Sequence, residues 1–91
     1  MDFEWNSHKA EINLGKHGVS FPEAGTVFGD DLAVTVPDPD HSDDEERFIT
    51  IGWSNRRRLL MVSHIDRDDR IRIISARELT RTERKAYEEG I

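Results

Sequence analysis

The stretch "LLMVSHIDRDDRIRIISAR", residues 59–77, predicts a β-hairpin at the centre of the fold. Residues 59–65 are almost continuously apolar, as in a central strand, and residues 70–77 begin by alternating arginine with isoleucine. The intervening "DRDD", residues 66–69, is long enough only for a tight turn. Strands joined by so short a turn pair antiparallel, so we expect an antiparallel sheet.

The remaining chain supplies further strands and helices around this hairpin. Strands are predicted over residues 3–5, 32–36 and 47–53, and helices over residues 7–17, 22–28 and 80–89. Asn6, Ser20 and Thr80 are suited to cap the three helices, and Gly18 to end the first. This order predicts an α+β fold, with an antiparallel sheet of about four to five strands, two N-terminal helices and one C-terminal helix.

Length and composition indicate one small domain over residues 1–91. The chain has no cysteine, which excludes disulfides and thiolate metal sites and fits a reducing compartment. No signal-peptide pattern precedes the polar N-terminus, and no apolar run approaches the roughly 20 residues of a membrane span. We therefore expect a soluble cytoplasmic domain with no membrane association.

Charge is distributed unevenly along the chain, whose formal net charge is −6. Residues 1–46 hold 2 basic and 12 acidic side chains, whereas residues 47–91 hold 11 basic and 7 acidic ones. Much of the acidic excess lies in "DPDHSDDEE", residues 38–46, which is expected to form an acidic loop. Such asymmetry favours a basic face for a polyanion beside an acidic flank.

Arginines form the most suggestive group of functional side chains. Arg72 and Arg77 belong to the last predicted strand, and Arg81 and Arg84 recur at helical spacing just after it. Guanidinium groups bind phosphate bidentately, so converging arginines suit an RNA backbone. The alternative is a solvated surface whose arginines pair with neighbouring glutamates, and motif content alone favours that alternative.

Histidine and tyrosine are the other candidates for proton transfer. His17 closes the first helix, His41 lies in the acidic loop, and His64 ends the central strand, where it could face a cleft at the sheet edge. The ordinary alternatives are a helix-terminal, a solvated and a buried core histidine, and the residues alone favour these alternatives. Tyr87 is equally compatible with packing. No phosphate-binding glycine loop or metal motif is present, so neither a metal nor a cofactor is expected.

Three segments together resemble the BrnT family of bacterial type II toxins. They are "FEWNSHKAEINLGKHGVSF" (3–21), "ERFITIG" (46–52) and "RIRIISARELTRTERKAYEEG" (70–90). The resemblance implies a RelE-like fold and a metal-independent ribonuclease that cleaves RNA and arrests translation. It also implies neutralisation by a cognate, BrnA-like antitoxin, through which operator DNA would be contacted only indirectly.

The resemblance also suggests roles for matched residues. We assign phosphate stabilisation to Arg77 and Arg47. Binding of the RNA backbone is assigned to Arg72, Arg81, Arg84 and His17. Proton transfer falls among Lys16, His64, Glu83 and Tyr87, which the sequence does not rank.

Two departures from the family pattern favour a weaker enzyme. Glu78 follows Arg77 where the family often has a basic residue, and the acidic loop precedes Arg47. The alternative function is therefore a catalytically weak interaction module that binds an antitoxin and supports repression of its operon. Direct DNA binding by this chain alone is less favoured, because its net charge is negative and it has no helix-turn-helix signature.

Overall fold

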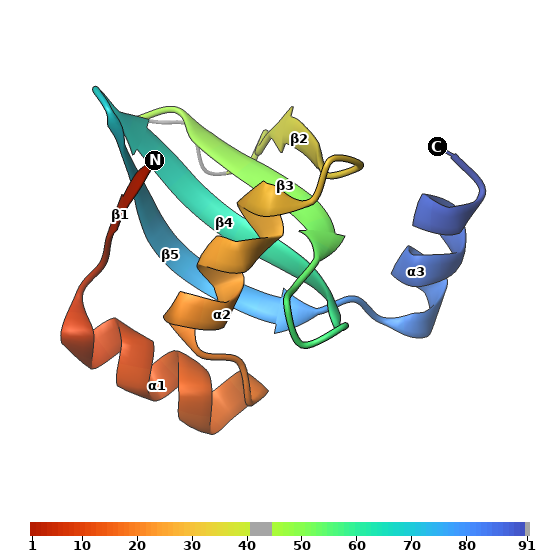
Figure 1. The fold of residues 1–91 in the computed structure, drawn as a ribbon, viewed down its shortest axis with the longest axis horizontal. Helices are drawn as coiled ribbons and strands as arrows, with labels where there is room; N and C mark the ends of the chain where they lie inside the picture. The colour runs from red at the N-terminus through yellow and green to blue at the C-terminus, as the bar shows by residue number, and fades with distance from the viewer. Residues whose placement is uncertain (41–44, 91) are drawn as a thin grey trace.

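The computed structural model describes residues 1–40 and 45–90 (Figure 1). His41 and the centre of the predicted acidic loop lie outside these residues. The elements follow in the order β1 (Asp2–Glu4), α1 (Ser7–His17), α2 (Phe21–Thr26), the 3₁₀ turn η1 (Val27–Gly29), β2 (Val34–Pro37), β3 (Arg47–Trp53), β4 (Leu59–Arg67), β5 (Arg70–Glu78) and α3 (Arg81–Glu88).

The five strands form one sheet in the order β1-β5-β4-β3-β2. Strands β2 to β5 pair antiparallel with their neighbours, as the short turns predicted, and Asp68 adopts a left-handed φ of 52° in the β4–β5 turn. Strand β1 pairs parallel with β5, so the sheet is mixed. The sequence predicted only antiparallel pairing, because that prediction rested on short turns between consecutive strands. Most of the chain separates β1 from β5, so no short turn constrains their direction.

Side-chain caps set the helix boundaries close to the predicted ones. The side chain of Asn6 accepts a hydrogen bond from the Lys9 amide at 3.0 Å, and Gly18 ends α1 with a left-handed φ of 69°. Ser20 caps α2 in the same way. Thr80 and Glu83 form the reciprocal capping box at the start of α3.

Helices α1 and α2 lie on the same side of the sheet, and α3 stands apart from α1 at the far side of the molecule (Figure 1). Apolar side chains from the α1–α2 connection, α2, η1, β4 and β5 form the core on the α2 side: Val19, Phe21, Ala24, Val27, Leu60, Val62, Ile73 and Ala76. The opposite surface of the sheet is called the open face. Its central positions are Ile49 and Ile51 on β3, Met61 and Ser63 on β4, and Ser75 on β5.

A β-bulge interrupts the pairing of β4 with β5. Ser63 pairs with Ser75 and His64 pairs with Ile73, which leaves Ile74 without an opposite residue. The extra residue changes the alternation of β5 at this point. Arg72 and Arg77, five positions apart, therefore both lie on the open face.

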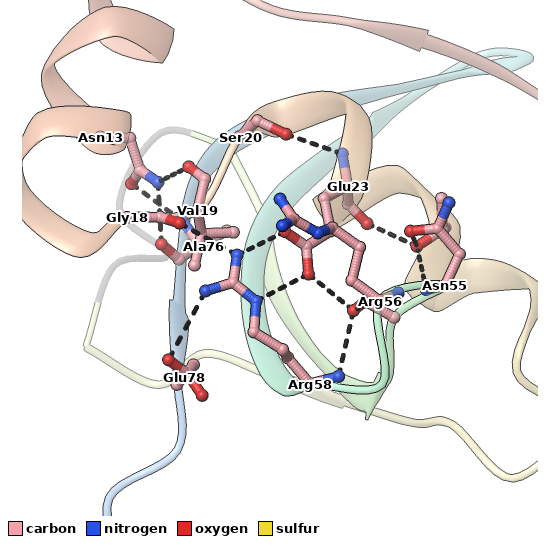
Figure 2. A network of polar contacts seen from close by, with 12 residues as sticks. Asn13, Gly18, Val19, Ser20, Glu23, Asn55, Arg56, Arg58, Ala76 and Glu78 are labelled. Atoms are coloured by element: carbon pink, nitrogen blue, oxygen red, sulfur yellow. Dashed lines mark hydrogen bonds and ion pairs between the residues drawn. The ribbon is translucent and has the colours of Figure 1, made fainter.

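The side-chain amide of Asn13 joins α1 to the outer edge of β5, beyond the point where β1 has ended (Figure 2). It accepts a hydrogen bond from the Ala76 amide at 3.1 Å and donates to the carbonyls of Ala76 and Val19 at 2.8 and 2.9 Å. Asn13 is 5% exposed. The carboxamide thus takes the place of a neighbouring strand for these buried peptide groups.

A second polar network joins α2 to the β3–β4 turn (Figure 2). The carboxylate of Glu23, which is buried, is paired with the Arg58 guanidinium and accepts a hydrogen bond from the Ser54 hydroxyl at 2.7 Å. Arg58 also donates to the Gly18 carbonyl at 2.9 Å, at the end of α1. Hydrogen bonding from Arg58 lowers the pKa of Glu23 despite its burial, so the pair stays ionised.

We expect Asn13→Ala to lower the free energy of unfolding by about 3 kcal/mol, because it leaves the Ala76 amide and two carbonyls buried without partners. Urea denaturation of this variant, beside Glu11→Ala as an exposed control on the same helix, measures the effect. Equal stability of the two variants would contradict the proposed role of the carboxamide.

Candidate active site

Arg77 lies on the open face near the end of β5, and its side chain is 38% exposed. Its two terminal nitrogens donate to the two carboxylate oxygens of Glu83 at 2.8 and 2.9 Å. One of them also lies 3.4 Å from the sulfur of Met61. The guanidinium is therefore fixed in orientation, and its bidentate edge is occupied by a carboxylate in the free chain.

Glu83 has two partners that favour its ionised form. The Arg77 guanidinium and the Thr80 amide, in that order, lower the pKa of Glu83 from an ordinary value of 4.5 to about 2. A carboxylate with so low a pKa is a poor proton acceptor near neutral pH. The proton-transfer role predicted for Glu83 therefore has no support from this geometry, which makes Glu83 the partner of Arg77.

Lys16 and His17 line a small pocket of about 190 Å³ between α1 and β5, which we call the α1–β5 pocket. Lys9, Ile12, Asn13, Ile74 and Ser75 complete its lining. The carboxamide bonds of Asn13 hold this part of α1 against the strand. The pocket thus combines two lysines, an imidazole and a hydroxyl, a set that suits an anion.

Ser75 connects the pocket with Arg77. Both residues point to the open face of β5, two positions apart, which corresponds to about 7 Å along the strand. Lys16, His17 and Arg77 therefore all lie near the same end of β5, and Arg77 lies outside the lining of the pocket.

Arg47 and Arg72 form a separate basic group at the other end of the open face. They flank Ile65 on the two neighbouring strands, four residues of β4 away from the position opposite Arg77. That interval is about 13 Å. Arg72 is paired with Glu4 at 2.8 Å. Arg47 and Arg77, both assigned to phosphate stabilisation, therefore lie at opposite ends of the open face, too far apart to contact one phosphate together.

His64 does not face a cleft. The residue is 1% exposed and lies in the core, between the rings of Phe28 and Phe48. Its Nε2 lies 2.7 Å from the Thr50 hydroxyl and its Nδ1 lies 2.9 Å from the Asp66 carboxylate. Burial lowers the pKa of His64, so a neutral and fully bonded core histidine is the correct interpretation.

The predicted residues of α3 divide between packing and exposure. Tyr87 donates to the Leu32 carbonyl at 3.1 Å, and Arg84 lies 5.0 Å from the centre of the Trp53 ring. Burial raises the pKa of Tyr87, which disfavours proton transfer by its hydroxyl. Arg81 is exposed at the first turn. These contacts and the Arg77–Glu83 pair hold α3 against the sheet, and no residue of α3 is buried.

Sequence reasoning missed Ser75 and Lys9 as parts of the pocket. Ser75 is an ordinary serine until the bulge turns it to the open face beside Arg77. Lys9 lies seven residues before Lys16, which is two helical turns, so this spacing was the available signal.

Among residues 1–40 and 45–90, no three histidine, aspartate or glutamate side chains are grouped as metal ligands would be. Within the same residues, no helix has the length and apolarity needed to cross a membrane.

Comparison with known proteins identifies the family. The profile of the family described as "Ribonuclease toxin, BrnT, of type II toxin-antitoxin system" matches residues 5–83. The chain belongs to the BrnT family. No curated protein sequence matches it.

A solved structure agrees with this assignment. The fold is similar to that of the Brucella abortus ribonuclease toxin BrnT, known from a crystal structure at 1.1 Å resolution, with a TM-score of 0.66 and 21% sequence identity. The alignment covers 89% of this chain and 99% of the Brucella toxin. The predicted α+β architecture is thereby confirmed. Membership of a type II toxin–antitoxin family also implies an antitoxin partner.

The Arg77–Glu83 pair is expected to make stability depend on pH in the acid range. Because the folded pKa of Glu83 is below the unfolded one, the contribution is complete above about pH 4.5 and is lost as pH falls towards 2. Both groups are partly exposed, so the effect is about 1 kcal/mol. The free energy of unfolding in urea should therefore decrease less steeply between pH 4.5 and pH 2 in Glu83→Gln, which keeps the capping box, than in the control Glu88→Gln. Identical slopes would argue against the pair.

Proposed function

We propose that this BrnT family member is a metal-independent endoribonuclease of the cytoplasm that arrests translation and is neutralised by its antitoxin. The observation that carries the proposal is the convergence of Arg77 with the α1–β5 pocket at one end of β5. Family membership supplies the substrate class, and the geometry supplies the groups that RNA cleavage needs.

RNA cleavage without a metal requires three things from side chains. A base removes the proton of the 2′-hydroxyl, whose oxygen attacks the phosphorus. Positive charge stabilises the phosphorane, and an acid protonates the departing 5′-oxygen, leaving a cyclic phosphate and a 5′-hydroxyl. The number of protons is unchanged overall, so two groups of opposite protonation state suffice.

Arg77 is suited to stabilise the phosphorane. Its guanidinium is held by Glu83 and Met61, and Glu83 raises its pKa, so the charge is permanent. A phosphate on the open face competes with Glu83 for the same two terminal nitrogens. The substrate phosphate then takes the place of the Glu83 carboxylate, so the guanidinium of Arg77 has an anionic partner both before and after RNA binds.

His17 and Lys16 are suited to the proton transfers. His64 is enclosed, Glu83 is held ionised and the Tyr87 hydroxyl is bonded to a carbonyl. Lys16 and the half-buried His17 instead open into the pocket beside Ser75. Imidazole is the side chain that serves as acid or base near neutral pH, so we assign that role to His17.

Arg47 and Arg72, the second basic group, are assigned to orient the RNA along the open face. Arg47 and Arg72 lie about 13 Å from Arg77 on the same face, so they are placed to bind the backbone away from the cleaved bond. Arg81 extends this surface from α3.

Arg77→Ala is expected to lower RNA cleavage by roughly 100- to 1,000-fold, because it removes the positive charge at the phosphorane. Arg77→Lys should recover only a small part, since lysine cannot bind bidentately. Cleavage of a labelled RNA by purified protein, with and without EDTA, measures both. Arg70→Ala, which removes a largely exposed guanidinium 4.0 Å from Glu4, is the matched control. Wild-type activity of Arg77→Ala would overturn the assignment.

His17→Asn is expected to lower the single-turnover rate by roughly 100-fold at saturating RNA and to flatten its pH profile near neutrality. His8→Asn, at the exposed first turn of the same helix, should leave rate and profile unchanged. A His17→Asn variant that loses RNA affinity but keeps the pH profile would assign His17 to binding only.

The alternative function, an interaction module, is favoured by one observation. Glu83 occupies the bidentate edge of Arg77 in the free chain. Purified protein that binds antitoxin but cleaves no RNA, even as Glu83→Gln, would support the module over the enzyme.

A further inference from the structure

Strand β2 is one outer edge of the sheet and carries exposed apolar side chains. Val34 and Val36 are 47% and 43% exposed and project from the open face, and Leu32, just before the strand, is 76% exposed. An apolar edge strand of this kind favours pairing with a further strand, since the outward amide and carbonyl of Thr35 have no neighbouring strand within residues 1–40 and 45–90. The edge of β2 is therefore a candidate binding site for a strand from another molecule.

A groove of about 290 Å³ adjoins this edge. It lies between α3 and the open face. Its apolar lining comes from Val34, Val36, Ile51, Met61, Ala86 and Tyr87, and Glu83 completes it. Side chains from one side of an added strand would point into this groove, because alternate residues of a strand share a face. The edge and the groove thus form one surface, called the β2 surface.

Carboxylates flank the β2 surface at both ends. Asp31 precedes the strand, and Asp40 and Glu46 follow it, all exposed and without an ion-pair partner within residues 1–40 and 45–90. Asp30 also precedes the strand, and its carboxylate accepts hydrogen bonds from the Leu32 and Trp53 amides at 3.0 and 2.8 Å. An apolar centre between acidic ends is complementary to an apolar strand with basic flanks.

Two other occupants fit less well. In a second copy of this chain paired edge to edge, the acidic ends would face each other in either strand direction, which costs energy through like-charge repulsion. RNA is disfavoured by the same carboxylates. The exposed Ile12 and Leu14 on α1 form no comparable surface, because residues two apart on a helix point in different directions.

We propose that the β2 surface binds an extended segment of the antitoxin, which adds to the sheet as a sixth strand beside β2. The segment has apolar residues at alternate positions, which enter the groove, and lysine or arginine at its ends, which meet Asp31 and Glu46. This inference rests on the proposed function only for the identity of the partner. The antitoxin surface adjoins the proposed RNA site, because Met61 and Glu83 line the groove and both contact Arg77.

Amide hydrogen exchange of the purified toxin–antitoxin complex tests the location without any variant. We expect the amide of Thr35, which points away from β3, to become protected on complex formation by about tenfold or more, as in a paired strand. Unchanged exchange at β2, with protection confined to α1 and β5, would overturn the proposal.

Titration calorimetry with the double variant Val34→Lys/Val36→Lys tests the chemistry. Antitoxin binding should weaken by roughly tenfold or more, while Leu14→Lys, an equally exposed apolar residue on α1, should bind as wild type. Asp31→Lys/Glu46→Lys should weaken binding several-fold and reduce its salt dependence. Circular dichroism confirms that each variant is folded. Unchanged affinity in the folded valine variant would overturn the proposal.

The outcome is independent of catalysis. Binding and exchange are measured without RNA cleavage, so an inactive enzyme leaves the test intact. If RNA, and not the antitoxin, protected the Thr35 amide, RNA would be the occupant and the proposal would be wrong. An active ribonuclease with no protection at β2 would refute the surface and leave the proposed function standing.

Discussion

The outer edge of β5 imposes the constraint on which the site depends. Strand β1 pairs with only the first residues of β5, so the buried peptide groups of Ala76 need another partner. Asn13 supplies it from α1, and a helix held in this way places Lys16 and His17 beside Ser75. The requirement to satisfy backbone hydrogen bonds therefore positions the pocket, as well as stabilising the fold.

The buried Glu23–Arg58 pair completes this arrangement from the other side. Arg58 contacts the end of α1 at Gly18 and the start of α2 at Glu23, and it lies 3.6 Å from Glu78 at the end of β5. One guanidinium thus links two helices with the strand that carries Arg77 (Figure 2). Removing Arg58 would leave the buried carboxylate of Glu23 without its ion-pair partner, so such a change is expected to destabilise the fold.

Local signals predicted the elements well, and long-range partners escaped prediction. Helix caps at Asn6, Ser20 and Thr80 act within a few residues, so their sequence signatures are readable. The partners of Asn13 and His64 depend on how distant segments pack, which no periodicity encodes. The sequence of an apolar strand that ends in histidine is the same whether the imidazole faces a cleft or packs against a phenylalanine. Arg77 was found from its motif, but its occupation by Glu83 required the structure.

The single extra residue of the bulge gives β5 a counting property. Arg72 and Arg77 are an odd number of positions apart, so in a regular strand of the same length one of the two guanidinium groups would point into the core. A regular strand that lacked Ile74 would restore an even spacing and keep both arginines on the open face. The bulge and the spacing of the arginines are therefore coupled in β5, so that losing or gaining one residue here leaves the open face intact only if the bulge is lost or gained with it.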